Sequence, residues 1–174
     1  MKKRIMTEAA GSLVTNWLIK AIKDSNNIAV ASDINPESVG KFLADDFIIV
    51  PPAKDPLLWD KILALLIEKK INIVIPSLDE TLHLWSIHCD QLAEQYGIQV
   101  VISDIKTINT FQDKYQTYLF FKNNDIPTPN TSLTQKYPLL KPRFGRGGKG
   151  ILVSEDKVAS MDGLISQELL EGEE

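Results

Sequence analysis

A short segment in the second half of the chain, K-P-R-F-G-R-G-G-K-G from Lys141 to Gly150, concentrates residue types that bind phosphate. Four of its last six residues are glycines, which let a backbone approach a ligand closely and turn successive N–H groups toward it. Arg143, Arg146 and Lys149 add positive charge beside those N–H groups. The segment therefore predicts a loop that binds a polyphosphate.

Two common phosphate-binding motifs do not fit this loop. It matches G-x-G-x-x-G, but the dinucleotide motif needs a helix after the last glycine, whereas Ile151–Val153 favours a strand. A Walker A loop needs Lys and Ser or Thr directly after its last glycine, and Ile151 follows Gly150. The remaining interpretation is a β-hairpin that folds over phosphates as a flap. A plain hairpin with solvated charges stays open as an alternative, although it needs fewer glycines and cations.

The composition is that of an ordinary globular protein of 174 residues, with 44% hydrophobic and 24% charged residues, in one large or two small domains. The net charge of −4 and the pI near 5.3 argue against a nucleic-acid binder. No apolar run approaches the roughly 20 residues of a membrane span, and the basic start lacks the apolar stretch of a signal peptide. Cys89 is the only cysteine, so we expect no intrachain disulfide and a cytoplasmic location.

The first part of the chain alternates short apolar segments, typical of strands, with longer amphipathic segments, typical of helices. The predicted strands are Arg4–Thr7, Ile28–Ser32, Phe47–Val50, Ile71–Ile75 and Ile98–Ile102. Alternation at this spacing predicts parallel strands with right-handed crossovers. We therefore expect an α/β fold, an open doubly wound sheet of about five strands, over residues 1–103.

Helical periodicity predicts which side chains of the intervening helices are buried. For the helix after the first strand these are Val14, Trp17, Leu18, Ala21 and Ile22. For the helix after the third strand they are Leu58, Trp59, Ile62, Leu63 and Leu66. A short helix is also expected to open at Pro36, with Asn35 as its N-cap.

Residues 104–174 follow a different pattern, which predicts a small α+β subdomain. Two helices, at about 104–111 and 112–124, end at the break Asp125–Pro129. The rest of the chain predicts strands at Thr131–Leu133, Pro138–Arg143, Gly150–Ser154 and Leu164–Leu170.

Three segments accompany the glycine loop in a fixed order. Asp113-Lys114 opens a helix upstream, Lys141-Pro142 precedes the loop, and Q-E-L-L-E-G-E-E ends the chain from Gln167. In this order they resemble the ATP-grasp superfamily, and more closely its branch similar to the large subunit of carbamoyl-phosphate synthase. Residues 1–103, with D-I-N-P from Asp33 and P-S-L-D-E from Pro76, resemble its Rossmann-like pre-ATP-grasp domain. Residues 104–174 resemble its first ATP-grasp subdomain, up to the hinge strand.

The resemblance implies ATP as the ligand and assigns a role to each segment. Lys114 and Lys141 would contact the phosphates, and Gly145–Gly150 would cover the β- and γ-phosphates. Gln167–Leu170 would be the hinge strand whose backbone pairs with adenine, and Glu174 would accept from the ribose hydroxyls. The implied ATP-binding residues are Lys114, Lys141, Arg143, Gly145, Arg146, Gly147, Gly148, Lys149, Gly150, Gln167, Glu168, Leu169, Leu170 and Glu174.

Other polar residues have simpler interpretations. Asp79 and Glu80 are expected to be carboxylates that favour a helix N-terminus. His83 and His88 are five residues apart and so point to different helix faces, which argues against a metal site with Cys89. Lys114 without the resemblance would be a solvated helix lysine.

In ATP-grasp proteins a second subdomain follows the hinge and carries the acidic and Asn residues that hold Mg²⁺. No Glu…Glu-x-Asn pattern follows the hinge here, so we expect no catalytic and no metal-binding residues in these 174, and Mg²⁺ only in a longer protein. The resemblance implies the N-terminal part of an ATP-dependent carboxylate–amine ligase that works through an acyl phosphate and is inactive alone. Its carboxylate and amine stay unidentified.

Two other functions remain open at this point. One is a non-catalytic ATP-binding or interaction module that works with a second polypeptide. The other, weaker one is an NAD-binding domain. We expect the apolar last strand to pair with a second copy of the chain or with a C-terminal half, and we expect neither nucleic acid nor membrane as a partner.

Overall fold

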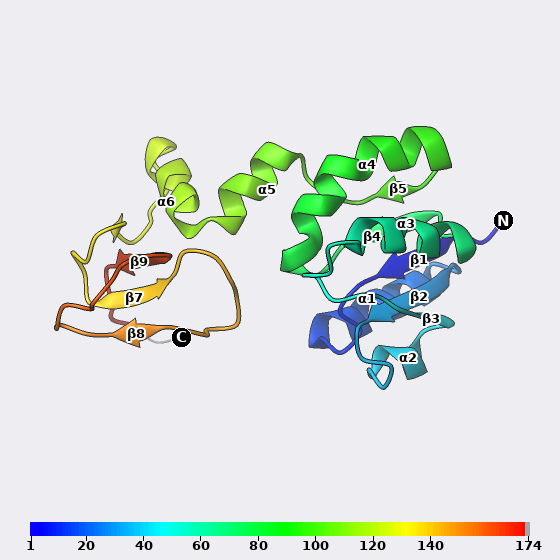
Figure 1. The fold of residues 1–174 in the computed structure, drawn as a ribbon, viewed down its shortest axis with the longest axis horizontal. Coiled ribbons are helices and arrows are strands. Elements are labelled where there is room, and N and C mark those ends of the chain that lie inside the picture. Colours follow the sequence, from blue (N-terminus) through cyan, green and yellow to red (C-terminus); the bar gives the residue numbers. More distant parts are fainter. Residues whose placement is uncertain (173–174) are drawn as a thin grey trace. The chain divides into compact units, whose positions relative to one another are not determined.

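The structure, a computed structural model, describes residues 1–172, so Glu173 and Glu174 lie outside the description below. The chain divides into two compact units, Met1–Ile105 and Lys106–Glu174. Each unit contains its own β-sheet (Figure 1). No helix in the described part of the chain is long and apolar enough to cross a membrane.

The first unit is an α/β domain around a five-stranded parallel sheet. Its elements are β1 (Arg4–Thr7), α1 (Leu13–Asp24), β2 (Ile28–Asp33), α2 (Gly40–Leu43), β3 (Asp46–Ile49), α3 (Leu58–Glu68), β4 (Ile73–Ile75), the 3₁₀ turn η1 (Asp79–Thr81), α4 (Leu82–Tyr96) and β5 (Gln99–Val100). The strand order β3-β2-β1-β4-β5 is that of an open, doubly wound sheet. The predicted fold class is confirmed.

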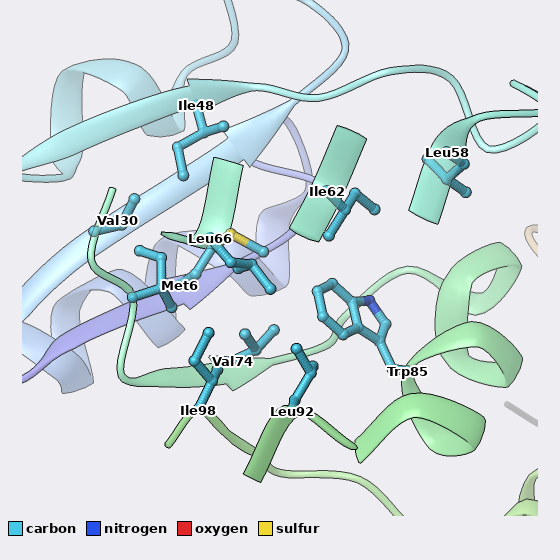
Figure 2. Packing of buried hydrophobic residues seen from close by; sticks show 11 residues of the cluster. Met6, Val30, Ile48, Leu58, Ile62, Leu66, Val74, Trp85, Leu92 and Ile98 are labelled. Atoms are coloured by element: carbon cyan, nitrogen blue, oxygen red, sulfur yellow. The ribbon is translucent and has the colours of Figure 1, made fainter. Parts of the chain in front are cut away.

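Side chains on the two faces of this sheet belong to two separate apolar clusters. On one face Met6, Val30 and Val74 pack in one cluster with side chains of α3 and α4, among them the fully buried Trp85 (Figure 2). On the other face, neighbouring strand residues pack with α1. Successive strand residues point to opposite faces of the sheet. Because both faces are covered, consecutive residues of these strands are apolar.

Helix α1 buries a different face from the one predicted. Thr15, Ile19 and Ile22 are its buried residues, whereas the exposed fractions of Val14 and Trp17 are 62% and 72%. The prediction was right for Ile22 and wrong for Val14, Trp17 and Ala21, which are exposed, while Leu18 is partly buried. The Thr15 hydroxyl donates to backbone carbonyl oxygens at the end of β1, at 2.9 Å each, so a polar residue anchors the buried face. The predicted face of α3 is confirmed, with Leu58, Ile62 and Leu66 buried.

The short helix α2 begins at Gly40 and not at Pro36. Asn35 does not cap it, because the Asn35 side chain accepts a hydrogen bond from the Glu37 N–H within a turn. Asp33 accepts in the same way from the Asn35 N–H. These side-chain hydrogen bonds satisfy the backbone in a non-helical conformation, which explains why the prediction of a helix at Pro36 was wrong.

The second unit combines two helices with a four-stranded antiparallel sheet of order β6-β9-β7-β8. Its elements are α5 (Ile105–Gln112), which starts at the boundary between the units, α6 (Lys114–Asn123), β6 (Thr131–Ser132), β7 (Leu139–Pro142), β8 (Leu152–Val153) and β9 (Leu164–Gln167). Leu140 and Ile165 are almost fully buried at the centre of the sheet. The sheet pairs β7 with β8, so the predicted hairpin around the glycine loop is confirmed.

Candidate functional site

The glycine loop joins the two strands of the β7–β8 hairpin. Its glycines at 145, 147, 148 and 150 have φ angles of 104°, 70°, 70° and 77°. This left-handed region is costly for residues with a Cβ atom, which explains the choice of glycine. The segment from 144 to 150 is exposed to solvent, so its backbone is accessible to a ligand.

A cavity of about 120 Å³ lies between this loop, the end of β7 and the start of α6. Its lining residues are Lys114, Lys141, Pro142, Gly145, Arg146, Gly147, Gly148, Lys149 and Ile151. Four of them are basic, and none is a carboxylate. Such a lining favours an anion with several negative charges.

Lys114 reaches this cavity as the first residue of α6. Asp113 is the N-cap of the helix, and its carboxylate accepts from the backbone N–H groups of Tyr115 and Gln116. The ammonium group of Lys114 donates a hydrogen bond of 2.7 Å to the carbonyl oxygen of Gly145. The side chain therefore spans from the helix to the glycine loop.

Lys141 approaches the cavity from the sheet, in β7. Its ammonium group donates to the amide oxygen of Gln167 in β9 at 2.6 Å. Burial, together with the charge of Lys114, lowers the pKa of Lys141 below its ordinary value. Among residues 1–172, the acceptors of both lysines are neutral groups, which do not compensate the charge of either ammonium.

Arg143 differs from these lysines. Its guanidinium donates three hydrogen bonds to the Asp113 carboxylate, at 2.8, 2.8 and 2.5 Å. These hydrogen bonds, together with the negative charge of Asp113, raise the pKa of Arg143. Arg143 is not among the described residues that line the cavity.

Of the predicted hinge strand Gln167–Leu170, only Gln167 belongs to β9. Residues 168–170 are not in a strand, so the prediction of a strand as far as Leu170 was wrong by three residues. The Glu168 N–H donates to the Asn130 carbonyl at 2.9 Å, and the Glu168 carboxylate accepts from the Asn130 backbone N–H at 3.1 Å. Leu169 and Leu170 are exposed by 49% and 64%. Gln167–Leu170 do not line the cavity among the described residues, and the predicted ribose ligand Glu174 lies outside them.

The structure therefore brings together Lys114, Lys141, Arg146 and Lys149 with the loop glycines 145, 147 and 148, while Gly150 completes the loop beside them. Asp113 was not among the predicted site residues. An Asp directly before a helix is an N-cap signal, but its pairing with Arg143 across 30 residues has no signature in the sequence.

A magnesium ion does not fit the described part of this site. Mg²⁺ takes oxygen ligands, chiefly carboxylates and water, and the cavity lining offers basic, apolar and glycine residues. Within residues 1–172 no group of three or more His, Cys, Asp or Glu side chains is arranged to hold a metal. His88, one of the histidines considered above, instead stacks on the Trp59 ring at 3.9 Å.

Comparisons with known proteins identify the family of the chain. A family model described as "PylC-like, N-terminal domain" matches residues 10–101, and one described as "ATP-grasp domain" matches residues 111–174. The carbamoyl-phosphate synthase of Methanobrevibacter smithii is 23% identical over 172 residues, covering 88% of this chain and 46% of that protein. The chain thus spans about half the length of this relative.

Solved structures show the same fold. The biotin carboxylase domain dimer of Hydrogenobacter thermophilus 2-oxoglutarate carboxylase, solved with MgADP, ADP and bicarbonate, is 25% identical with a TM-score of 0.64, and the match covers 88% of this chain and 37% of that one. The L-amino acid ligase of Bacillus licheniformis is 14% identical with a TM-score of 0.72, and the match covers 98% and 45%.

The family match over more than half of the chain and the match of the remainder confirm the resemblance inferred from the glycine loop and its companion segments. The chain belongs to the PylC-like N-terminal domain family and continues into an ATP-grasp domain.

Proposed function

We propose that this chain binds the phosphates of ATP in the cavity beneath its glycine loop. The observation that carries this proposal is the convergence of four basic residues from three elements, Lys114, Lys141, Arg146 and Lys149, on one cavity lined by glycines. ATP carries several negative charges on adjacent phosphates, so cations that approach from more than one direction match it.

The other parts of the nucleotide are assigned from the family resemblance. The backbone of Gln167–Leu170 would pair with the adenine edge, and Glu174 would accept from the ribose hydroxyls. The exposed Leu169 and Leu170 follow β9 in the same unit as the cavity, which supports this assignment.

The reaction that we propose for the whole protein is the ligation of a carboxylate to an amine. A carboxylate oxygen attacks the γ-phosphorus of ATP, ADP leaves, and the resulting acyl phosphate is attacked by the amine with release of phosphate. The names of two relatives, a carbamoyl-phosphate synthase and an L-amino acid ligase, support this class. The chain covers about half of each. We therefore assign the Mg²⁺ ligands and the acceptor site to the other half of such a protein. We also propose that the protein is located in the cytoplasm.

A thermal-shift experiment on the 174-residue chain tests the ATP site. ATP is expected to raise the melting temperature, because a ligand that binds only the folded state stabilises it, while NADH at the same concentration leaves it unchanged. Lys149→Ala, in the cavity lining, should reduce the ATP-dependent shift, and Lys157→Ala, an exposed lysine of the same unit outside the lining, should not. Stabilisation by NADH and not by ATP would refute the proposal.

The second candidate is a non-catalytic ATP-binding module that acts with another polypeptide. The described residues supply no metal ligands for phosphoryl transfer, so the chain fits such a module as well as it fits the first half of a ligase. Reading the coding sequence past codon 174 separates the two: a downstream segment with a Glu…Glu-x-Asn pattern supports the ligase.

We also propose that the exposed Leu169 and Leu170 contact a second copy of the chain or a C-terminal half. Light scattering that shows only monomer at high concentration would argue against the second copy.

A further inference from the structure

The ion pair between Arg143 and Asp113 joins the end of β7 to the start of α6. The guanidinium Nε donates to both carboxylate oxygens at 2.8 Å, and Nη2 donates to Oδ2 at 2.5 Å. A backbone hydrogen bond also joins the two segments: the Lys114 N–H donates to the Arg143 carbonyl oxygen at 3.1 Å. Two segments about 30 residues apart are therefore fixed to each other by side chain and backbone together.

The Asp113 carboxylate stays ionised in this arrangement. Asp113 is only 4% exposed, and burial alone raises the pKa of its carboxyl. The hydrogen bonds from Arg143 and from the N–H groups of Tyr115 and Gln116 outweigh burial and hold the pKa below its ordinary value. The negative charge of Asp113 therefore balances the positive charge of Arg143, which weakens the attraction of the pair for an anion.

Lys114 directly follows this pair in the chain. Its backbone N–H is bound by Arg143, its neighbour Asp113 caps the helix, and its ammonium group lies 2.7 Å from the Gly145 carbonyl oxygen. A shift of the pair would therefore move the backbone from which the Lys114 side chain extends. The partners of Lys114 and Lys141, by contrast, are a carbonyl and an amide, which do not cancel charge.

We propose that Asp113 and Arg143 act as a positioning pair that holds Lys114 against the glycine loop, and that Arg143 is not itself a phosphate ligand. This inference rests on the proposed function, in which the cavity binds ATP. It revises the role that the family resemblance gave to Arg143, while the roles of Lys114 and Lys141 stay unchanged.

The Asp113→Asn variant tests the proposal through the sign of its effect on ATP binding. Asparagine keeps the N-cap, because its side-chain oxygen accepts from the same N–H groups, but it removes the charge. If Arg143 were a phosphate ligand, removing an adjacent anion would free its charge and tighten ATP binding. If the pair positions Lys114, ATP binding should weaken by about five- to tenfold, as expected for the loss of a charge-assisted bidentate contact.

Isothermal titration calorimetry of the 174-residue chain with ATP, and with inorganic tripolyphosphate, measures this sign. Arg143→Gln should weaken binding to the same extent as Asp113→Asn, and the double variant should be no weaker than either single variant, since both changes break one contact. Arg143→Lys keeps the charge without the bidentate fork, so a positioning role predicts a loss there as well.

The Lys114→Ala background separates positioning from a general structural defect. When Lys114 is already absent, Asp113→Asn should cost no further affinity, whereas a loosened unit would lose affinity in both backgrounds. Circular dichroism and urea unfolding identify any variant that fails to fold, and Arg143→Lys is the alternative if Asp113→Asn is one of them.

The outcomes distinguish the inference from the function on which it rests. Wild-type chain that binds neither ATP nor tripolyphosphate overturns both. Wild-type chain that binds ATP, together with an Asp113→Asn variant that binds equally or more tightly, overturns only the positioning pair. Weaker binding by Asp113→Asn that disappears in the Lys114→Ala background supports it.

Discussion

The ammonium group of Lys141 donates a hydrogen bond of 2.6 Å to the amide oxygen of Gln167 on the neighbouring strand. The amide nitrogen of Gln167 in turn donates to the Thr131 hydroxyl at 2.8 Å, so the three side chains form a line across β7, β9 and β6. This line holds the lysine in place without an opposing charge. A half-buried cation whose described partner is a neutral amide is stabilised by a nearby anion.

Replacing Lys141 should weaken ATP binding and preserve the fold. Lys141→Ala removes a charge-assisted hydrogen bond to phosphate, which corresponds to about 1.5–3 kcal/mol of binding free energy. Titration calorimetry measures the loss, and circular dichroism checks the fold. Gln167→Glu is the matched variant: it keeps Lys141 but gives it an anionic partner, so it should also weaken ATP binding. A Lys141→Ala chain that is unfolded would mean that the lysine is structural.

The affinity for ATP should fall at alkaline pH earlier than an ordinary lysine would allow. Burial and the charge of Lys114 lower the pKa of Lys141 below 10.5 in the folded chain. The folded chain therefore releases this proton at a lower pH than the unfolded chain does. The free energy of unfolding therefore increases as pH rises from the lowered pKa to 10.5, because only the unfolded chain still carries this proton there. Phosphate binding needs the charged form of Lys141, so the affinity for ATP falls over the same pH range.

Calorimetry in buffers of different ionisation enthalpy detects this coupling as proton uptake on ATP binding in that pH range. The uptake should disappear in Lys141→Ala. Proton uptake of the same size in the variant would assign the effect to another group.

Gly150 should tolerate substitution less well than Gly147 in the same loop. Both have positive φ angles, 77° and 70°, so alanine at either position costs about 1 kcal/mol in backbone energy. A Cβ atom at Gly150 would also lie 2.9 Å from Pro142 Cγ, whereas at Gly147 no atom lies within 4 Å among the described residues. We therefore expect Gly150→Ala to lower the free energy of unfolding by about 1–3 kcal/mol more than Gly147→Ala. Equal urea midpoints for the two variants would contradict this.

Glu8 should make the first unit less stable as pH rises. Burial raises the pKa of its carboxyl above 4.5, outweighing the hydrogen bonds from Thr81 and Ser77. The folded chain then binds more protons than the unfolded chain between 4.5 and the raised pKa, so this group contributes most stability at or below pH 4.5 and loses it as pH rises through the raised value.

The Glu8→Gln variant isolates this effect, because glutamine does not titrate. Its free energy of unfolding relative to wild type should increase as pH rises from 4.5 through the raised pKa of Glu8, because only the wild-type chain loses stability there. Urea unfolding at several pH values measures the difference, in which the titrations of all other groups cancel. A difference that is independent of pH would show that Glu8 ionises normally.

The sequence predicted the elements of both sheets because their signals are local. The β-branched and apolar runs around β2 and β4, and the glycines between β7 and β8, define strands and a loop without reference to the rest of the chain. The buried face of α1 could not be chosen in the same way, since Val14 and Trp17 offer one apolar face and Ile19 and Ile22 another. Contacts with the sheet and with the end of β1 decide between them.

The candidate site was predictable as a set of cations and glycines, but not as a set of contacts. The sequence shows four cations in the segment from Lys141 to Gly150. It gives no sign that Arg143 is paired while Arg146 and Lys149 line the cavity. That distinction depends on the approach of α6 to β7, a tertiary contact between residues 30 positions apart. The predicted helix start at Pro36 was wrong because of local contacts rather than a tertiary one. Side-chain hydrogen bonds of Asp33 and Asn35 with nearby backbone N–H groups take the place of helical hydrogen bonds there.

The central claim is that the glycine loop and its neighbouring lysines bind the phosphates of ATP. Backbone amide chemical shifts of the ¹⁵N-labelled 174-residue chain, recorded during titration with ATP, test it most directly. The account predicts shifts at Gly145–Gly150, Lys114 and Lys141, with tripolyphosphate reproducing those shifts and leaving Leu169 and Leu170 unaffected. ATP-induced shifts that are confined to the first unit, around Gly11 and Asp33, would contradict it.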